Sequence, residues 1–425
     1  MRRSREERRK SEKRRSLQSL SSSKPHICLY IGSLQRGGAE RVMTNLAEHL
    51  YESGWRVTLV TTYCRLPEYV LPHGLWDPQT GQPYGKRRQE VPWGSHRHVE
   101  EEPAGIHRIY SDPPREKLEK GRVRGFLARF AGLREIWKEE KPDLILSFIG
   151  YNNIFAILTS IGLRIPAVVS VRSNPSREYA SAKLRIPAFL LFRGAAGVIL
   201  QTSEAKAFFP KAIQKKAVIL PNAINPDFVR PRYEGERRKE IVSVGRLDAN
   251  KNQAMLLKAL AKARAKGREH PEILNYSVHF YGDGPLREAL EQLAAELGLS
   301  ESAVFHGNVS DVRSRIEKSR IYVLTSKEEG MPNALLEAMS AGLACISADC
   351  PCGGPRDLIQ DGKNGFLVPV DDSDALAERL LVLVESDTVV DQMGQEASRV
   401  QESYNLKTVN GRWETYLEDI CSRKL

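Results

Sequence analysis

Short apolar runs recur along the first half of the chain, and longer segments with helical spacing separate most of them. The runs cover residues 26–32, 56–62, 107–110, 144–148, 167–171, 197–201 and 218–220. Apolar runs of this length that alternate with helical segments predict the strands of a parallel sheet with helices on its faces.

The same pattern starts again in the second half. Apolar runs lie at 241–244, 278–281, 321–324, 344–347 and 366–368, after a polar connector at about residues 221–238. A chain of 425 residues also exceeds what one hydrophobic core usually serves. We therefore predict two α/β domains, at 25–222 and 239–390, with a linker at 223–238 and helices at 391–425.

The positive charge of the chain is concentrated at its start. Residues 1–24 hold ten Lys or Arg and three Glu, so they carry +7 of the formal net charge of +11. Their low apolar content predicts a disordered tail. Such a tail either binds anionic lipid or nucleic acid electrostatically, without a specific nucleic-acid site, or is a solvated extension.

Residues 65–103 lack clear periodicity and contain several Pro, Gly and Trp residues. We expect an irregular insertion there that is either functional or disordered. His96 and His98 within it could bind a metal ion, but no carboxylate spacing supports such a site. We predict neither a metal site nor a cofactor.

Two basic stretches are amphipathic. Residues 122–138 and 183–193 interleave Leu, Ile, Val and Phe with Lys and Arg. Helices of this kind lie in a membrane interface or pack their apolar faces on the sheet, and both alternatives stay open here.

The remaining signals concern the cellular compartment. The chain has no run of about 18 uncharged apolar residues, and its start lacks the apolar segment of a secretory signal. The six cysteines are widely spread, with Cys28 and Cys345 in predicted strands, which indicates reducing surroundings. We predict a cytoplasmic protein that is bound peripherally to the inner face of the cell membrane.

Two carboxylates lie around the start of a predicted helix in the second domain. Pro332 has a preset φ and no backbone N–H, so it fits the first turn of a helix through Met339. Glu329 then lies in the preceding loop, and Glu337 lies about one and a half turns inside the helix. Ionised carboxylates accept strong hydrogen bonds from sugar hydroxyls.

Two cations precede them in the chain. Arg246 follows the run at 241–244, and Lys251 is expected to open the next helix. A cation at a helix start opposes the helix dipole unless an anion is bound nearby. The guanidinium fork and the ammonium point charge together suit a diphosphate leaving group, to which backbone N–H groups near Met331 and Asn333 would add.

These runs resemble the family 4 glycosyltransferases of the GT-B fold. Residues 31–42, 280–286, 305–309 and 364–368 match further family motifs in the expected order, and the resemblance spans about residues 26–420. It implies an α/β fold with two Rossmann-like parallel-sheet domains that face each other across a cleft, and C-terminal helices that cross back to the first domain. Within the family, the chain is similar to the subset that builds bacterial polysaccharides on lipid diphosphate carriers.

The resemblance also implies residue roles. Arg246, Lys251 and Glu329 would be catalytic, with Glu329 on the donor sugar and Glu337 on the ribose. The donor site would contain Gly37, Gly38, Gly282, Asn308, Val309, Gly330, Met331, Asn333 and Glu337. The implied reaction retains the anomeric configuration, needs no metal, and transfers a hexose or N-acetylhexosamine from a nucleoside-diphosphate sugar, with uridine favoured.

The acceptor is expected in the first domain, because ligands of such folds lie at the carboxyl ends of the strands. Tyr151 and Asn152 follow the run at 144–148, and Arg172 follows the run at 167–171. By resemblance, Arg172 would bind the phosphate of a lipid-linked saccharide; alternatively, it pairs with a structural carboxylate. Some relatives carry a His near the end of the 144–148 strand, and no His stands there in this chain, so no base is identified.

Other functions would use the same residues. An epimerase of the GT-B type acts on a sugar nucleotide without an acceptor, and a non-catalytic protein binds the sugar nucleotide without turnover. The pair Gly37 and Gly38, taken alone, also fits a simple tight turn before a helix. No Gly-x-Gly-x-x-Gly sequence follows the first apolar run, which disfavours a nicotinamide enzyme.

Overall fold

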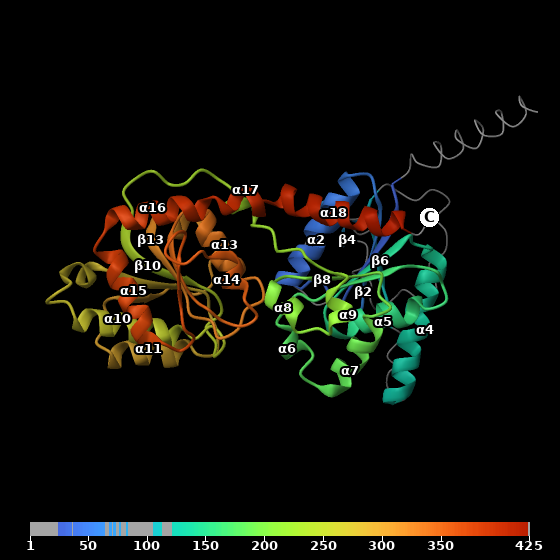
Figure 1. Cartoon of the computed structure of the whole chain (residues 1–425), viewed down its shortest axis with the longest axis horizontal. Helices are drawn as coiled ribbons and strands as arrows, with labels where there is room; N and C mark the ends of the chain where they lie inside the picture. The colour runs from blue at the N-terminus through green and yellow to red at the C-terminus, as the bar shows by residue number, and fades with distance from the viewer. Residues whose placement is uncertain are drawn as a thin grey trace, which may run out of the picture. The chain divides into compact units, whose positions relative to one another are not determined.

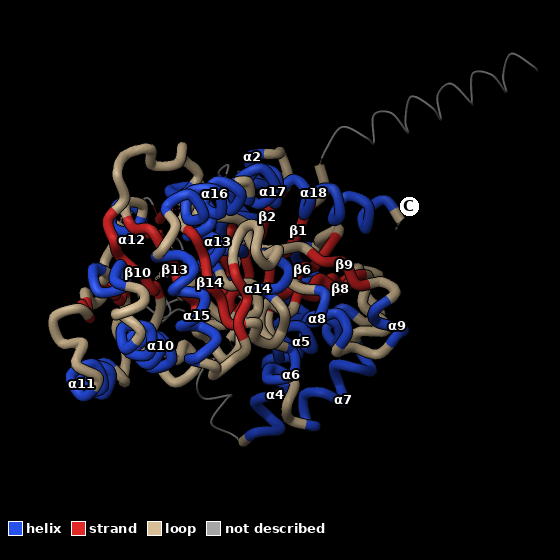
Figure 2. The backbone as a smooth tube through the Cα atoms, turned by 60° about the vertical axis from the view of Figure 1, so that its left-hand side comes forward, coloured by secondary structure: helices blue, strands red, loops and turns tan. Residues whose placement is uncertain are grey.

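The computed structural model describes residues 24–35, 37–63, 68–69, 71–73, 76–77, 82–83, 105–112 and 121–423. The chain divides into two compact units, which contain the two main parallel sheets (Figures 1 and 2). Unit 1 consists of the described residues up to Ser170, Lys183–Val198 and the described residues from Trp413 on. Unit 2 consists of Val171–Ala182 and Ile199–Arg412. The predicted α/β class with two parallel sheets is confirmed.

The first sheet has seven strands in the order β5-β2-β1-β6-β7-β8-β9. Their bounds are β1 His26–Ile31, β2 Arg56–Thr61, β5 His107–Tyr110, β6 Leu144–Phe148, β7 Ala167–Ser170, β8 Gly197–Leu200 and β9 Ala217–Ile219. Every residue of β1 and β6 is buried, as expected for central parallel strands that are covered on both faces. A separate pair, β3 Trp76–Asp77 and β4 Gln82–Pro83, is antiparallel and lies within the predicted insertion at 65–103, most of which is outside the described residues.

Helices cover both faces of the first sheet. Figures 1 and 2 show α4, α5 and α7 on one side of it and α2 and α18 on the other. The bounds are α2 Gly38–Glu52, α4 Arg122–Glu140, α5 Gly150–Ser160, α6 Pro175–Glu178, α7 Ala182–Leu191, α8 Ser203–Ala207, α9 Lys211–Gln214 and α18 Leu406–Ser422.

The second sheet has six strands in the order β12-β11-β10-β13-β14-β15. They span β10 Arg238–Val244, β11 Ser277–Tyr281, β12 Ala303–Phe305, β13 Ser319–Leu324, β14 Ala344–Ala348 and β15 Phe366–Val368. The helical segments of this half are η1 Pro226–Phe228, α10 Gln253–Ala265, η2 Pro271–Asn275, α11 Arg287–Glu296, α12 Val312–Ile316, α13 Asn333–Ser340, α14 Gly354–Leu358, α15 Ser373–Val384, α16 Asp387–Ser398 and α17 Val400–Tyr404. A buried apolar cluster on β10, β11, α10 and α15 forms much of its core.

The predicted strand positions agree with the structure to within about three residues, and one strand of the second sheet was missed. β12 is a short edge strand whose residues are half-buried or exposed, so its apolar signal is weak. β10 begins at Arg238 rather than residue 241, because the charged residues 238–240 extend the strand before its apolar part starts.

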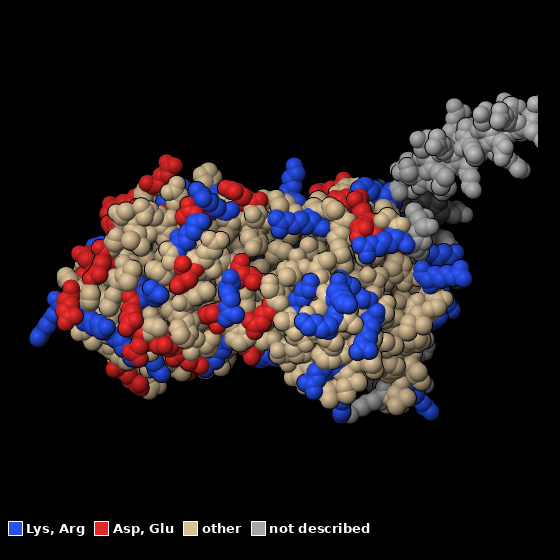
Figure 3. Space-filling view, in the orientation of Figure 1, with Lys and Arg blue, Asp and Glu red and all other residues tan. Residues whose placement is uncertain are grey.

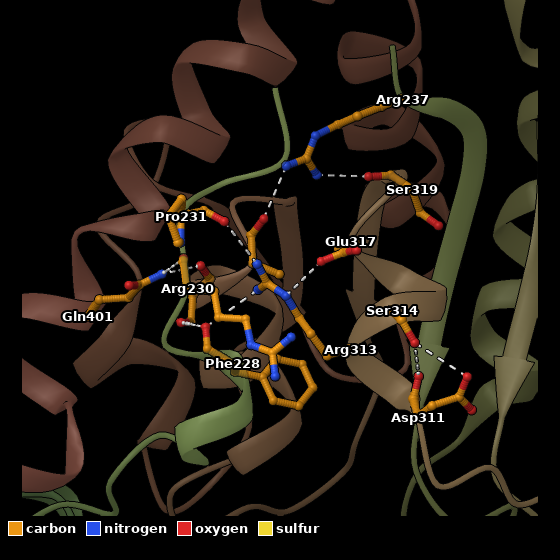
Figure 4. A network of polar contacts seen from close by, with 12 residues as sticks. Phe228, Arg230, Pro231, Arg237, Asp311, Arg313, Ser314, Glu317, Ser319 and Gln401 are labelled. Carbon is orange, nitrogen blue, oxygen red and sulfur yellow. Dashed lines mark hydrogen bonds and ion pairs between the residues drawn. The ribbon is translucent and has the colours of Figure 1, made fainter. Parts of the chain in front are cut away.

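The polar connector predicted at 223–238 is bonded to unit 2. Figure 4 shows two arginines that hold it. The Arg313 guanidinium is buried, donates to the Phe228 and Pro231 carbonyls at 3.5 and 3.3 Å, and pairs with Glu317. Arg237, within the connector, donates to carbonyls of β13 and of the residue after α13. Charged side chains therefore satisfy backbone oxygens where regular pairing is absent.

The second part of α18 belongs to unit 1. Trp413 is fully buried, and its ring lies 5.7 Å from the ring of Phe148 in β6. The Glu414 carboxylate accepts hydrogen bonds from Lys24, His49, Ser53 and Trp55. The core of unit 1 is thus completed by the second part of a helix, which comes after unit 2 in the chain.

Within the described residues, none of the helices combines the length and the apolar character needed to cross a bilayer.

Candidate active site

The structure brings together two of the residues predicted to be catalytic. The Lys251 ammonium donates to Glu329 Oε1 at 2.6 Å, although 78 residues separate them in the chain. Both side chains are largely covered, at 25 % and 13 % exposure, so solvent screens this ion pair less than a surface pair. A cation and a carboxylate are thereby placed at one point, where both can face a ligand.

The loop that carries Lys251 is held by its own polar groups. Asp248 Oδ1 accepts hydrogen bonds from the backbone N–H groups of Asn250 and Lys251. Asn250 Nδ2 donates to the Glu328 carbonyl, and the Thr325 hydroxyl donates to the Lys251 carbonyl. These bonds tie the 248–251 loop to the loop after β13, from which Glu329 projects.

Lys251 does not open a helix as predicted. α10 begins at Gln253, and Asn252 before it has a left-handed backbone conformation with φ of 52°. This conformation keeps Lys251 out of the helical turn, because residues of a right-handed helix have negative φ. Lys251 therefore lies outside the first turn of α10, and its ammonium pairs with the carboxylate of Glu329.

The backbone of Glu329 is fixed on both sides. Its N–H donates to the Pro351 carbonyl at 2.7 Å, and its carbonyl accepts from the Cys352 N–H at 2.8 Å. Burial, with a further contribution from the negative charge of Glu329, raises the pKa of the Cys350 thiol to about 12. The segment 350–352 therefore positions a carboxylate and is an inert, buried part of the unit.

The helix after this loop is α13. It begins at Asn333, and Pro332 is the residue before it, so the predicted helix start is confirmed to within one residue. Glu337 is the fifth residue of α13 and is half-buried. Gly330 and Met331 lie in the loop between Glu329 and the helix.

Arg246 is close in the chain to Lys251 but differently placed. Its side chain is 70 % exposed, and its Nε lies 3.7 Å from Asp248 Oδ2. An exposed pair at this distance holds a side chain weakly, so Arg246 can reorient toward a ligand.

Gly282 allows the Arg246 loop to pack closely on its neighbour. A Cβ atom at Gly282 would lie 2.1 Å from the Gly245 carbonyl oxygen, and the φ of Gly282 is 134°. Asn308 is exposed and Val309 half-buried in the loop after β12. This loop is tied to the same point, because the Gly282 N–H donates to the Gly307 carbonyl at 2.8 Å.

Arg172 lies in a buried network of unit 2. Its two terminal nitrogens donate to the Leu220 carbonyl and to Asn222 Oδ1. Burial lowers the pKa of Arg172 to about 9. Asn222 in turn donates through Nδ2 to Asn333 Oδ1 at 2.8 Å. These two hydrogen bonds go to uncharged oxygens, one of the backbone and one of an amide side chain.

The remaining predicted residues belong to unit 1. Gly37 is the residue before α2, and Gly38 is its first residue. The carboxylate of Glu40 folds back over Gly37, and burial raises the pKa of Glu40. Tyr151, which is 63 % exposed, and Asn152 lie in the first turn of α5, directly beyond β6.

Several contributors to the site were missed from the sequence. Asp248, Asn250 and Asn222 act through loop hydrogen bonds that have no periodic signal. Asn222 could have been found from its place just after β9, because the carboxyl ends of parallel strands collect polar groups. The sequence gives no such indication for the segment 350–352, because it holds Glu329 through backbone atoms, which every residue has.

Among the described residues, no group of three or more His, Cys, Asp or Glu side chains is arranged to hold a metal ion. His96 and His98 lie outside these residues.

Comparison with known proteins identifies the family of the chain. The family described as glycosyl transferase 4-like domain matches residues 37–222, and the family described as glycosyl transferases group 1 matches residues 227–400. The chain belongs to the family 4 glycosyltransferases of the GT-B fold, as its sequence motifs indicated.

Curated relatives include enzymes of surface polysaccharide assembly. The chain is 29 % identical over 297 residues to the GalNAc-α-(1→4)-GalNAc-α-(1→3)-diNAcBac-PP-undecaprenol α-1,4-N-acetyl-D-galactosaminyltransferase of Campylobacter jejuni, covering 69 % of this chain and 79 % of the relative. It is 30 % identical over 204 residues to the lipopolysaccharide 1,6-galactosyltransferase of Escherichia coli K12, covering 47 % of this chain and 54 % of the relative.

The fold is shared with solved structures. Anabaena HepE in complex with UDP and glucose superposes with a TM-score of 0.70 at 18 % identity, over 93 % of this chain and 100 % of that chain. The sucrose-phosphate synthase of Thermosynechococcus elongatus superposes with a TM-score of 0.67 at 18 % identity, over 94 % of this chain and 100 % of that chain. The predicted GT-B fold is confirmed.

Proposed function

We propose that this glycosyltransferase moves a hexose or N-acetylhexosamine from a UDP-sugar to a lipid-linked or polysaccharide acceptor, with retention and without a metal ion. The observation that carries the proposal is the contact of Lys251 with Glu329 at 2.6 Å. It puts a cation for a leaving phosphate beside a carboxylate for sugar hydroxyls.

In the proposed reaction, the bond between the anomeric carbon and the phosphate oxygen breaks while the acceptor hydroxyl oxygen bonds to that carbon. Negative charge grows on the departing diphosphate, where Lys251, Arg246 and the N–H groups near Met331 and Asn333 would stabilise it. The hydroxyl proton leaves with the diphosphate, on the same face of the sugar, which accounts for retention. Since the cations supply the electrostatic stabilisation, the step needs no metal.

The donor would lie in unit 2, along the loops after β10, β11, β12 and β13. Glu329 would hold the sugar hydroxyls and Glu337 the ribose, and Gly282, Gly330, Asn308 and Val309 would line the nucleotide. The short backbone contact that Gly282 permits keeps these loops together. Gly37 and Gly38, at the start of α2 in unit 1, are proposed to approach the diphosphate through their backbone.

For the acceptor we propose a saccharide on a lipid diphosphate. The Campylobacter relative is named as an enzyme that acts on such an acceptor. Tyr151 and Asn152, beyond the carboxyl end of β6, are the proposed contacts in unit 1. A phosphate contact for Arg172 stays a prediction, because two of its nitrogens already donate to uncharged oxygens. A lipid-linked acceptor also implies that the protein works at the inner face of the cell membrane.

A transfer assay tests the proposal. The purified full chain is incubated with UDP-GalNAc, UDP-GlcNAc, UDP-galactose or UDP-glucose and a short-chain polyprenyl-diphosphate saccharide, in the presence of EDTA. We expect mass spectrometry to show addition of one sugar, and NMR to show an α linkage formed from an α donor.

The other outcomes separate the alternatives. An epimerised sugar nucleotide formed without acceptor would identify an epimerase. Tight binding of UDP-sugars by calorimetry with no product from any acceptor would support a binding protein. Formation of a β linkage, or loss of transfer with EDTA, would contradict retention or metal independence.

A further inference from the structure

One surface of unit 1 exposes large apolar side chains. It is the outer surface of the layer formed by α4, α5 and α7, and we call it the helical face (Figures 1 and 2). Its exposed apolar residues are Val123 (72 %), Phe126 (45 %) and Leu127 (57 %) on α4, Ile161 (57 %) just after α5, and Ile186 (58 %) and Leu190 (61 %) on α7. These residues do not pack on the sheet, so core packing does not account for all of the amphipathic pattern at 122–138 and 183–193.

Cations outnumber acidic groups over most of the helical face. The sequence has no Asp or Glu at 121–134, 144–177 or 179–203, the segments that contain most of the face. Exposed cations occur in the same segments: Arg124, Arg164, Lys183, Arg185 and Arg193. Figure 3 shows blue and tan atoms without red ones over α7. Acidic residues return at the second half of α4, with Glu135 and Glu139.

A groove opens within this face. It has a volume of about 360 Å³ and lies between the end of α5, the following loop and the end of α7. Its apolar lining is Ile157, Ile161, Ile165, Leu190 and Leu191, and Arg164 also lines it. Sites that hold small ligands usually have roughly 300–1,000 Å³, so one hydrocarbon chain is a suitable occupant in size and polarity.

We propose that the helical face docks on an anionic lipid bilayer, and that the groove receives one hydrocarbon chain of an anionic phospholipid whose head group lies at Arg164. Apolar side chains interleaved with cations match the boundary between head groups and acyl chains. A protein partner of acidic character would match the cations but would not need an apolar groove. The proposal deepens the proposed function, since it names the surface that brings the protein to a lipid-linked acceptor.

A tryptophan reporter tests the contact at the groove. In the full-length Leu190→Trp variant, vesicles containing phosphatidylglycerol should shift the added emission to shorter wavelength, and bromine on the acyl chains should quench it at least twofold. The matched control is Val382→Trp, on α15 of unit 2, because Val382 is exposed to 42 %. The reporter lies on α7, so binding of the basic segment at 1–24 alone does not change it. Equal, small effects of brominated lipid on both variants would overturn the proposal.

Changing the charge of the helical face tests docking in a second way. Ile186→Asp combined with Leu190→Asp should weaken sedimentation with the same vesicles at least tenfold, whereas Val382→Asp should leave it unchanged. Removal of one cation, as in Arg185→Gln, should weaken binding roughly fivefold at low salt and less at high salt. Unchanged sedimentation of the double variant, or equal binding to purely zwitterionic vesicles, would contradict docking by this face.

The result can be separated from that of the transfer assay. With a short-chain acceptor in detergent-free solution, the Ile186→Asp, Leu190→Asp variant should transfer sugar at the wild-type rate, since neither residue belongs to the proposed catalytic or donor site. Vesicle binding by the wild type without any transfer would support the docking surface and contradict the proposed function. Transfer without vesicle binding would support the proposed function and contradict the docking surface.

Discussion

At the scale of single residues, the candidate site depends on charges that loop backbones hold in place. Lys251 contacts Glu329 because Asp248 and Asn250 fix one loop, and Pro351 and Cys352 fix the other. The ammonium of Lys251 and the carboxylate of Glu329 are therefore positioned by hydrogen bonds from groups that have no proposed role in the reaction. Substitutions in those partners should affect the site through position and not through charge.

Replacement of Lys251 tests its part in stabilising the leaving diphosphate. We expect Lys251→Ala to lower turnover about 100-fold, the usual effect of removing one preorganised donor at a developing negative charge. Lys262→Ala is the matched control, because Lys262 is 43 % exposed and pairs with Asp374 away from the loop. Turnover of Lys251→Ala within a few-fold of the wild type would contradict the assigned role.

Replacement of Glu337 tests the ribose contact. A hydrogen bond to a charged group contributes about 1.5–3 kcal/mol, so Glu337→Gln should weaken binding of UDP roughly tenfold or more. Calorimetry with UDP alone measures this without any catalytic step. Glu288→Gln, in the first turn of α11, serves as the control. If both variants bind UDP as the wild type does, Glu337 does not contact the nucleotide.

At the scale of elements, continuous apolar runs made the strands predictable. β1 and β6 are buried along their whole length, so their sequences contain little else than apolar residues. β12 lies at a sheet edge and gave no such signal. The start of α10 was predicted too early, at Lys251, because Asn252 adopts a left-handed conformation that has no signature in the hydrophobic pattern.

As with the strands and helices, only a part of the candidate site could be predicted from the sequence. Glu329, Lys251 and Glu337 were predicted as site residues, and the structure brings the first two into contact. Asn222 was missed, because its partners Arg172 and Asn333 lie 50 and 111 residues away in the chain. Spacing along a sequence reports neighbours on one helix or strand, but it does not report which loops meet in space.

The connector provides a prediction about an element without regular structure. Arg313→Met should destabilise unit 2 by about 2–3 kcal/mol, because the Phe228 and Pro231 carbonyls lose a buried donor and Glu317 loses its partner. Denaturant unfolding measures the loss. Arg315→Met on the same helix is the control, since Arg315 is 43 % exposed, and it should change stability by less than about 0.5 kcal/mol. Equal stability of the two variants would contradict the connector's dependence on Arg313.

At the scale of the whole molecule, neither unit is made from one continuous stretch of chain. Unit 1 ends at Val198 and resumes at Trp413, and unit 2 contains Val171–Ala182 as well as Ile199–Arg412. Five strands of the first sheet, β1, β2, β5, β6 and β7, lie in unit 1, and the whole second sheet lies in unit 2. The stability of unit 1 should then depend on residues that a division into sequential domains would assign elsewhere.

Replacement of Trp413 tests this dependence. Removing a fully buried Trp typically costs about 3–5 kcal/mol, so Trp413→Ala should destabilise unit 1 by that amount. Hydrogen exchange read by mass spectrometry should show faster exchange in β6 and unchanged exchange in β10. Arg423→Ala is the control, because Arg423 is 67 % exposed. Faster exchange in both sheets, or in neither, would show that Trp413 does not belong to the core of unit 1 alone.

The position of Trp413 and Glu414 also bears on the order of events during translation. When β1, β2 and β6 have left the ribosome, the side chains that cover Phe148 and bond His49 have not yet been synthesised. All of Ile199–Arg412 emerges first and can acquire its own core in the meantime. A chain truncated before residue 413 and released from the ribosome should therefore hold a folded second half and a first half that is still sensitive to protease.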